Sequence, residues 1–256
     1  MCDFGTGVLI SKLLKALGAH EIYNSKKQFI FEAPGVFKPT ATTYYLLHHL
    51  SLEDLKDKAV LDLGCGSGII GVELLLQNIF VKHIYFSDLS KEAIIVCNEN
   101  LNSFELGNKG TVKQGSLFEP WDDHKFDLIV NDVSGISNQV PFFSEWFEDI
   151  PCDCGETGID LFEQMITKAK SYLENGGKLI TPLISLSDID KAYNLIEKCN
   201  FSRKILGKHS WVRKIKSDQE LLIMGKLKSE GMIRYDIENG NYVFFTEIIE
   251  LERNPD

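Results

Sequence analysis

The chain has 256 residues, of which 44% are hydrophobic and 25% are charged. These shares are typical of a globular protein, so they exclude a disordered or collagen-like chain and allow one large domain or two small ones. Because 37 acidic residues face 27 basic ones, the net charge is −10, which weighs against free nucleic acid as a partner. A local exception is the acid-free stretch 203–216, which we interpret as a solvated strand edge.

We expect a cytoplasmic protein with no membrane contact and no bound metal. No window approaches the roughly 18 apolar residues that span a bilayer, and Asp3 stands where a secretory signal would be basic. The six cysteines lack the spacing of a disulfide framework and are expected to be free thiols. Cys152-Asp153-Cys154 resembles half of a zinc site, but no second cysteine pair or histidine pair accompanies it.

The first part of the chain predicts two helices joined by a loop. Apolar residues at helical spacing predict a helix over 7–18, and a second helix is predicted over 44–50. Between them, residues 33–39 are rich in Pro and Gly and therefore predict a loop.

From Lys58 onward, predicted strands and helices alternate. The predicted strands are 59–64, 82–87, 111–115, 126–131 and 178–184. The predicted helices are 68–78, 90–104, 158–174 and 187–199. This alternation indicates right-handed crossovers and a parallel sheet with helices on both faces. The strand 126–131 is apolar on both faces after Asp127, as expected at the centre of a sheet.

The end of the chain predicts antiparallel strands. Residues 201–212 and 242–251 read as strands, and residues 218–229 read as a helix between them. A further strand-like run at 232–235 precedes Asn239-Gly240, a strong hairpin signal. We therefore expect residues 1–50 to form a helical extension with a cofactor-site loop. Residues 51–256 are expected to form the main domain, with a helix–hairpin insertion near 213–240.

A glycine-rich turn follows the first predicted strand of the sheet. It reads Asp62-Leu63-Gly64-Cys65-Gly66-Ser67-Gly68. Residues 66–71 also fit the dinucleotide fingerprint, with Asp88 at the distance of its ribose-binding acid. A buried carboxylate at Asp62, however, would repel an anionic pyrophosphate and suits a ligand with an ammonium or sulfonium group. Asp88 ends the second strand, where a carboxylate can accept hydrogen bonds from both hydroxyls of a ribose.

These residues resemble the class I S-adenosylmethionine-dependent methyltransferases. The resemblance covers roughly residues 33–185 and implies S-adenosylmethionine as cofactor, with the glycine turn holding its methionine part and Asp88 its ribose. It also implies an α/β, Rossmann-like, three-layer fold. The sheet of that fold is mostly parallel and seven-stranded, with an antiparallel last strand, for which residues 242–249 are our candidate.

Further motifs resemble the small-domain branch of that family, which includes the release-factor glutamine methyltransferases. They are Pro34-Gly35-Val36-Phe37 with Thr43, the run 87–93, and Gly115-Ser116-Leu117-Phe118, in which the family usually has an acid at the place of Ser116. The cofactor-binding residues implied by this resemblance are Phe37, Thr43, Asp62, Gly64, Cys65, Gly66, Gly68, Asp88, Leu89, Ser116, Leu117 and Asn131.

The chain departs from this branch after the fourth predicted strand. The family has Asn-Pro-Pro-Tyr there, but this chain reads Asn131-Asp132-Val133-Ser134. Our catalytic candidates are Asn131 and Asp132, since either can accept a hydrogen bond from a nucleophile. A turn-forming role for Asp132 is an alternative. The aromatic residues Trp121, Trp146 and Phe142-Phe143 are interpreted as local core rather than a stacking platform.

The sequence therefore predicts methyl transfer to a nitrogen or oxygen nucleophile, with a protein or RNA of the translation machinery as acceptor. Alternatives are a small-molecule acceptor, a cofactor-binding protein without turnover, and a nicotinamide-dependent oxidoreductase.

Overall fold

The fold is taken from a computed structural model of the chain. It describes residue 29 and residues 33–51, 53–77, 80–133, 135–147 and 154–254. The predicted helix over 7–18 lies outside the described residues, and so do Cys2 and Cys152.

One mixed sheet forms the middle layer, with strand order β3-β2-β1-β4-β5-β8-β6 and the short β7 paired to β8. Strands β1 to β5 pair in parallel, whereas β8 runs antiparallel to both of its neighbours, β5 and β6. The bounds are β1 Ala59–Leu63, β2 His83–Asp88, β3 Gly110–Gln114, β4 Phe126–Asn131, β5 Leu173–Ile184, β6 Phe201–Lys214, β7 Asp236–Glu238 and β8 Asn241–Arg253. The expected fold class is confirmed, and β7 adds an eighth strand.

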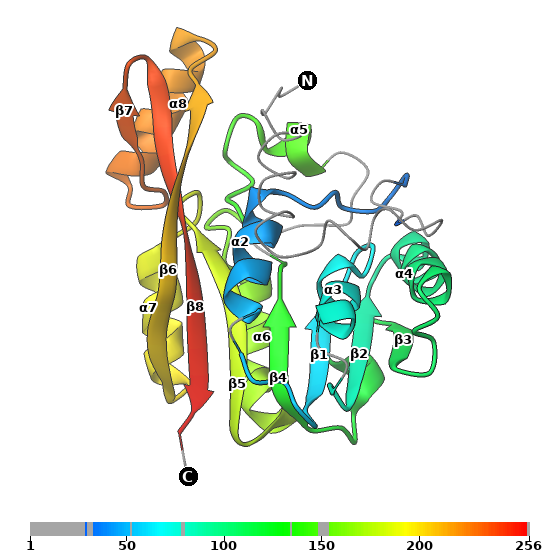
Figure 1. The fold of residues 1–256 in the computed structure, drawn as a ribbon. Coiled ribbons are helices and arrows are strands. Elements are labelled where there is room, and N and C mark those ends of the chain that lie inside the picture. Colours follow the sequence, from blue (N-terminus) through cyan, green and yellow to red (C-terminus); the bar gives the residue numbers. More distant parts are fainter. Residues whose placement is uncertain are drawn as a thin grey trace.

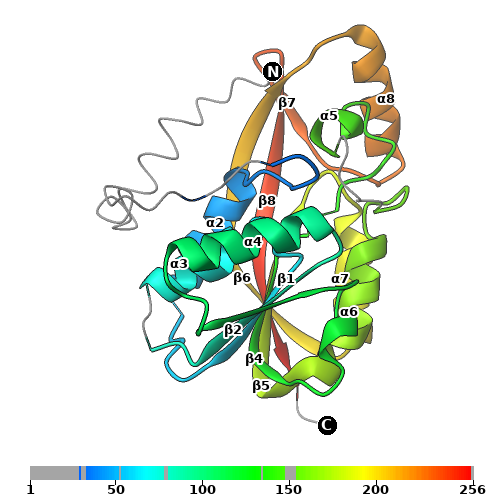
Figure 2. The same ribbon diagram turned by 90° about the vertical axis from the view of Figure 1, so that its right-hand side faces the viewer.

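Helices cover both faces of the sheet, as Figures 1 and 2 show. One apolar cluster joins α2, α3 and α4 to one face, and a second joins α6 and α7 to the other. The bounds are α2 Ala41–Leu50, α3 Ile69–Gln77, α4 Lys91–Ser103, the 3-10 turn η2 Glu119–Trp121, α5 Phe143–Phe147, α6 Asp160–Tyr172, α7 Ile189–Lys198 and α8 Asp218–Ser229. Within the described ranges, every helix is too short or too polar to cross a bilayer.

Strand β5 begins earlier than predicted. The sequence predicts a strand from 178, but β5 already begins at Leu173. The pairing of β4 with β5 shifts register between Phe126 and Leu128, and Gly176 has a φ of +75°. Gly176 and Gly177 therefore lie inside β5, at an irregularity in its pairing with β4. Such an irregularity depends on the partner strand, so the local sequence does not predict it.

The predicted strand over 232–235 is wrong. Ile233 and Tyr235 are buried in the apolar cluster beneath α8, and the strand that pairs with β8 is β7, which begins at Asp236. The Asn239-Gly240 turn is confirmed, because Glu238 pairs directly with Asn241 across it. Both turn residues have positive φ, as the favoured two-residue hairpin turn requires.

The helix and hairpin between β6 and β8 project beyond the edge at which β1, β2 and β4 end (Figure 1). We call residues 213–240 the extension. Its core is formed by the segment after β4 together with α8 and β8, and it includes Phe142, Met224 and Phe244. Trp121 and Phe142 are both buried, which confirms their interpretation as core. Nothing is described of the Trp146 side chain.

Close contact between α3 and the sheet depends on Gly71. A Cβ atom there would lie 2.2 Å from a ring carbon of Phe86 and 3.0 Å from Ile84 Cγ2. We therefore expect Gly71→Ala to lower the free energy of unfolding by about 1–3 kcal/mol.

The matched control for this prediction is Gly225→Ala, because Gly225 lies in α8 with nothing within 4 Å of its Cβ position. Its helix propensity predicts a gain of up to about 1 kcal/mol. Urea unfolding of both variants measures the difference, and an equal effect on the two would contradict the close contact.

Candidate functional site

A cavity of about 160 Å³ opens where β1, β2 and β4 end. It is far larger than the roughly 10–15 Å³ that one water molecule requires. Ligands of open α/β sheets bind at this edge, outside the carboxyl ends of the strands. The residues lining it are Gly35, Phe37, Pro39, Thr43, Gly64, Cys65, Gly66, Ser67, Ile69, Ile70, Ser87, Asp88, Leu89, Ser90, Ala93, Gly115, Ser116, Leu117, Asp132, Val133, Phe147 and Leu161.

The glycine turn between β1 and α3 forms the floor of the cavity. Backbone N–H groups of Gly64 and Cys65 both donate to the Ser87 carbonyl, at 2.8 and 3.0 Å, and so fasten the turn to β2. Gly64 and Gly68 have φ values of +72° and +79°. A Cβ atom would lie 2.0 Å from Val133 at the first and 2.6 Å from Cys97 at the second. No other residue type fits either position.

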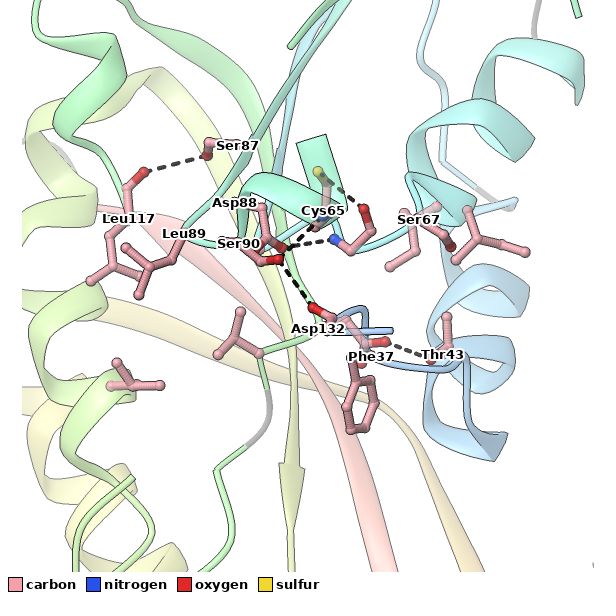
Figure 3. A pocket seen from close by; sticks show the side chains of 18 of the residues that line it. Phe37, Thr43, Cys65, Ser67, Ser87, Asp88, Leu89, Ser90, Leu117 and Asp132 are labelled. Carbon is pink, nitrogen blue, oxygen red and sulfur yellow. Dashed lines mark hydrogen bonds between the residues drawn. The ribbon is translucent and has the colours of Figure 1, made fainter. Parts of the chain in front are cut away.

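Asp88 is oriented by the backbone around it. Its Oδ2 accepts a hydrogen bond from Gly66 N at 2.9 Å, and its Oδ1 accepts one from Ser90 N at 2.8 Å (Figure 3). Ser90 in turn caps α4 by accepting from Ala93 N. Burial raises the pKa of Asp88, and the backbone hydrogen bonds oppose this rise. Since each carboxylate oxygen has two lone pairs, Asp88 keeps acceptor capacity toward the cavity.

Asp62 lies behind the cavity wall. Its side chain is 1% exposed and its Oδ2 accepts from Gly71 N at 3.0 Å, while Oδ1 has no hydrogen-bond partner among the described residues. Burial, with a smaller effect of the charges of Asp132 and Asp88, raises the pKa of Asp62 to about 7 against the opposing effect of the Gly71 hydrogen bond. A carboxylate in this position acts on a ligand through its charge.

Asp132 faces the cavity from the end of β4 and is held by α2. The Thr43 hydroxyl donates to Asp132 Oδ2 at 2.6 Å (Figure 3). It accepts from Thr40 N at 3.0 Å, at the start of that helix. Burial raises the pKa of Asp132 to about 7, against the effect of the Thr43 hydrogen bond. A carboxyl group with this pKa exchanges its proton near neutral pH.

Asn131 points away from the cavity, so the structure separates the two catalytic candidates. The Asn131 side chain is buried, donates to Thr181 Oγ1 at 3.0 Å and accepts from Val133 N at 3.2 Å. Its amide therefore makes hydrogen bonds to the protein itself, whereas the Asp132 carboxyl group reaches the cavity.

Most of the other predicted cofactor-site residues line the cavity. They are Phe37, Thr43, Gly64, Cys65, Gly66, Asp88, Leu89, Ser116 and Leu117. Gly68 does not line it but shapes the turn beneath it.

Sequence reasoning missed Phe147, which lines the cavity and stacks on Phe37 with ring centroids 5.6 Å apart. The aromatic residues 142–146 after the fourth strand pointed to this segment, but no motif identified the position that reaches the cavity.

Among the described residues at the cavity, the charged side chains are all acidic. Asp88 and Asp132 line it and Asp62 lies just behind, whereas no Lys, Arg or His is found among its described lining residues. Over the described ranges, no group of three or more His, Cys, Asp or Glu residues is arranged to hold a metal ion. The site therefore favours a cationic ligand over an anionic one.

Comparison with known proteins places this site in a family. Residues 27–133 match the family model described as "Methyltransferase small domain". The ribosomal protein uL3 glutamine methyltransferase of Francisella tularensis subsp. tularensis is 29% identical over 154 residues, which are 58% of this chain and 47% of that protein. The release factor glutamine methyltransferase of Geobacter sulfurreducens is 29% identical over 155 residues, covering 59% of this chain and 54% of that protein.

The chain thus spans about half the length of the curated relatives it matches. Among solved structures, the ribosomal protein L11 methylase of Lactobacillus delbrueckii subsp. bulgaricus has a TM-score of 0.54 at 17% identity, covering 86% of this chain and 82% of that one. This likeness concerns the fold. The matches confirm the resemblance over residues 27–133, a segment that contains the glycine turn and Asp88, and the chain has the class I methyltransferase fold.

Proposed function

We propose that the chain is an S-adenosylmethionine-dependent methyltransferase that transfers a methyl group to a nitrogen or oxygen nucleophile. The observation that carries this proposal is the gathering of three carboxyl groups, those of Asp62, Asp88 and Asp132, at one cavity whose described lining residues include no Lys, Arg or His. S-adenosylmethionine brings a sulfonium and an ammonium group, which would offset that charge. A dinucleotide would bring an anionic pyrophosphate, which these carboxylates would repel.

The residues of the cavity fit the parts of this cofactor. Asp88 has acceptor capacity for the ribose hydroxyls, and the backbone of Gly64 and Gly66 allows close approach of the methionine part. Leu89 and Leu117 provide apolar surface for the adenine ring. When bound, the cofactor supplies an activated methyl group, so the protein must position the nucleophile and accept its proton.

Asp132 is our candidate for accepting that proton. Its carboxyl group reaches the cavity and has a pKa of about 7, close to the value at which a general base works best near neutral pH. Asn131 is not suited to grip an acceptor amide, because its own amide is hydrogen-bonded to Thr181 and Val133. In this chain the Asp132 carboxyl group, rather than a side-chain amide, would therefore accept the hydrogen bond from the nucleophile.

For the acceptor we propose a protein or RNA of the translation machinery. The support is the names of the two curated relatives, whose acceptors are a ribosomal protein and a release factor. A second candidate function is cofactor binding without turnover, and the internal hydrogen bonds of Asn131 favour it. We further propose a cytoplasmic location, which suits such an acceptor.

The buried charge of Asp62 predicts a dependence of stability on pH. The pKa of Asp62 is about 7 in the folded chain against an ordinary 3.8, so the folded state binds more protons between these values. We therefore expect the free energy of unfolding to fall as pH rises from about 5 to about 8. Asp62→Asn removes this titration and keeps an oxygen acceptor for Gly71 N, so its slope should be shallower, by up to about 1.4 kcal/mol per pH unit.

Urea unfolding at several pH values measures both slopes. Asp132 also titrates with a raised pKa, so it leaves a residual slope of the same sign in Asp62→Asn. S-adenosylmethionine should flatten the slope of the wild type more than that of Asp62→Asn. Equal slopes without the cofactor would show that Asp62 does not carry the buried charge.

The proposed base predicts a separation of turnover from binding. We expect Asp132→Asn to lower the methyl-transfer rate by about a hundredfold or more, with a much smaller rise in the cofactor Kd, because Asp62 and Asp88 remain at the cavity. The assay incubates the protein with methyl-labelled S-adenosylmethionine and fractionated cell lysate, and Glu230→Gln on the exposed end of the extension is the control.

Label in protein or RNA would support the translation-machinery acceptor, and label confined to small molecules would overturn it. Tight cofactor binding without any label would favour the binding protein. If Asp132→Asn transferred label at the wild-type rate, Asp132 would not be the base.

A further inference from the structure

The extension and the segment after β4 share one apolar core. Phe142, from that segment, is buried together with Met224 of α8 and Phe244 of β8. Phe143 and Phe147, at the two ends of α5, pack against the same core. Because Phe147 also lines the cavity, α5 lies between the extension and the proposed cofactor site.

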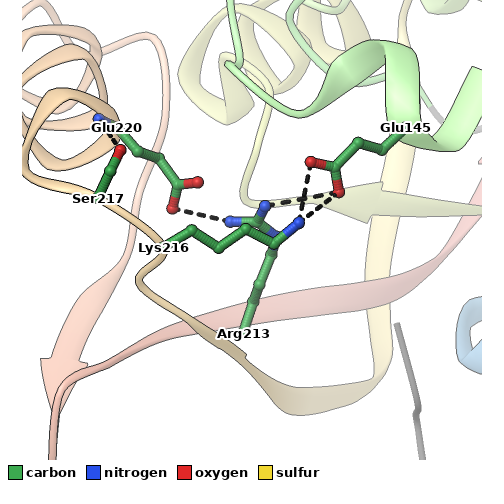
Figure 4. A network of polar contacts seen from close by, with 5 residues as sticks. All are labelled: Glu145, Arg213, Lys216, Ser217 and Glu220. Carbon is green, nitrogen blue, oxygen red and sulfur yellow. Dashed lines mark hydrogen bonds and ion pairs between the residues drawn. The ribbon is translucent and has the colours of Figure 1, made fainter. Parts of the chain in front are cut away.

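Arg213 is the buried cation of this core. It is 5% exposed, its guanidinium lies 3.6 Å from the centroid of the Phe142 ring, and its Nη1 donates to Glu220 Oε1 at 2.8 Å. Within the described part of the chain, Nε and Nη2 have no hydrogen-bond partner. The nearest acid on that side is Glu145 of α5, whose Oε2 lies 3.7 Å from Nη2 (Figure 4).

Lys216 holds the same Glu145 from the other side. Its Nζ donates to both carboxylate oxygens, at 3.0 and 2.9 Å (Figure 4). The hydrogen bond and charge of Lys216, together with the charge of Arg213, lower the pKa of Glu145. Two cations of the extension therefore hold one carboxylate of α5.

The position of α5 must come from such contacts. The helix has five residues, and a helix of this length is not stable by itself. Glu145 precedes Phe147 by two residues, and the Phe147 ring stacks on Phe37 with ring centroids 5.6 Å apart and planes 21° apart. Holding Glu145 therefore fixes the ring that closes this side of the cavity.

We infer that Arg213 and Lys216 are positioning residues, which hold Phe147 at the cavity through Glu145 and thereby strengthen cofactor binding. The inference rests on the proposed function in one respect, since S-adenosylmethionine is the ligand used to test it. It gives the extension a role in the site, although the extension contributes no residue to the lining of the cavity.

The test compares two charge reversals in matched surroundings. Glu145→Lys places a cation against Lys216 and Arg213 and should raise the Kd of S-adenosylmethionine about tenfold. Glu230→Lys makes the same charge change against Lys226 of α8, and the Glu145 and Glu230 side chains are 42% and 41% exposed. We expect this control to bind as the wild type does. Titration calorimetry measures both affinities.

The same charge reversal in the Phe147→Ala variant distinguishes positioning of the Phe147 ring from direct repulsion between the introduced lysine and the cationic cofactor. In Phe147→Ala, the ring that Glu145 positions is gone, so adding Glu145→Lys should not weaken binding further. Direct repulsion would persist in this background and would overturn the inference. Backbone hydrogen exchange over 143–147 should also be faster in Glu145→Lys without the cofactor, and unchanged exchange would contradict the anchoring.

If Glu145→Lys does not fold, the neutral variants Glu145→Gln and Lys216→Met replace it. Because both break the same link, each should raise the Kd by about two- to fivefold, and their combination should be no worse than Glu145→Gln alone. Additive effects would contradict the inference. A wild type that does not bind S-adenosylmethionine would instead refute the proposed function, and hydrogen exchange would still test the anchoring of α5.

Discussion

The site depends on carboxyl groups that the fold gathers at one cavity, where no Lys, Arg or His is found among the described lining residues. The side chain of Asp62 is inside the protein, and it lies close enough to Asp88 and Asp132 for their charges to raise its pKa. An unpaired buried carboxylate is costly, and only one of the Asp62 oxygens has a hydrogen-bond donor among the described residues. The same arrangement that destabilises the protein without a ligand prepares it for a cationic one. This is the physical reason to favour S-adenosylmethionine over a dinucleotide.

Parallel pairing brings these carboxylates together. Asp88 is the last residue of β2 and Asp132 directly follows β4; these strands flank β1, so both side chains line the cavity beside the glycine turn. The turn itself requires Gly64 and Gly68, because Val133 and Cys97 occupy the space that a Cβ atom would need. The chain can thus pass close beneath a ligand while the neighbouring strands supply the polar groups.

The segment after β4 differs from the Asn-Pro-Pro-Tyr pattern of the branch that the sequence resembles. The Asn131 side chain is hydrogen-bonded inside the protein and Asp132 lines the cavity, so we propose that a carboxyl group rather than an amide meets the acceptor. The same segment continues into α5, whose Phe147 packs on the extension and stacks on Phe37. The acceptor side of the site and the extension are therefore one packed unit, and we propose that they act together.

Local patterns in the sequence were enough to predict the sheet, the glycine turn, the place of Asp88 at a strand end and the hairpin at Asn239-Gly240. Each of these depends on backbone preferences or on the period of apolar residues, which neighbours in the chain determine. Only the tertiary structure decided that Asn131 is internal and that Phe147 reaches the cavity. It also decided that β5 begins before its glycines and that Arg213 and Lys216 meet Glu145. These outcomes depend on contacts between residues far apart in the chain, and the spacing of residues in a sequence does not encode which of them will touch.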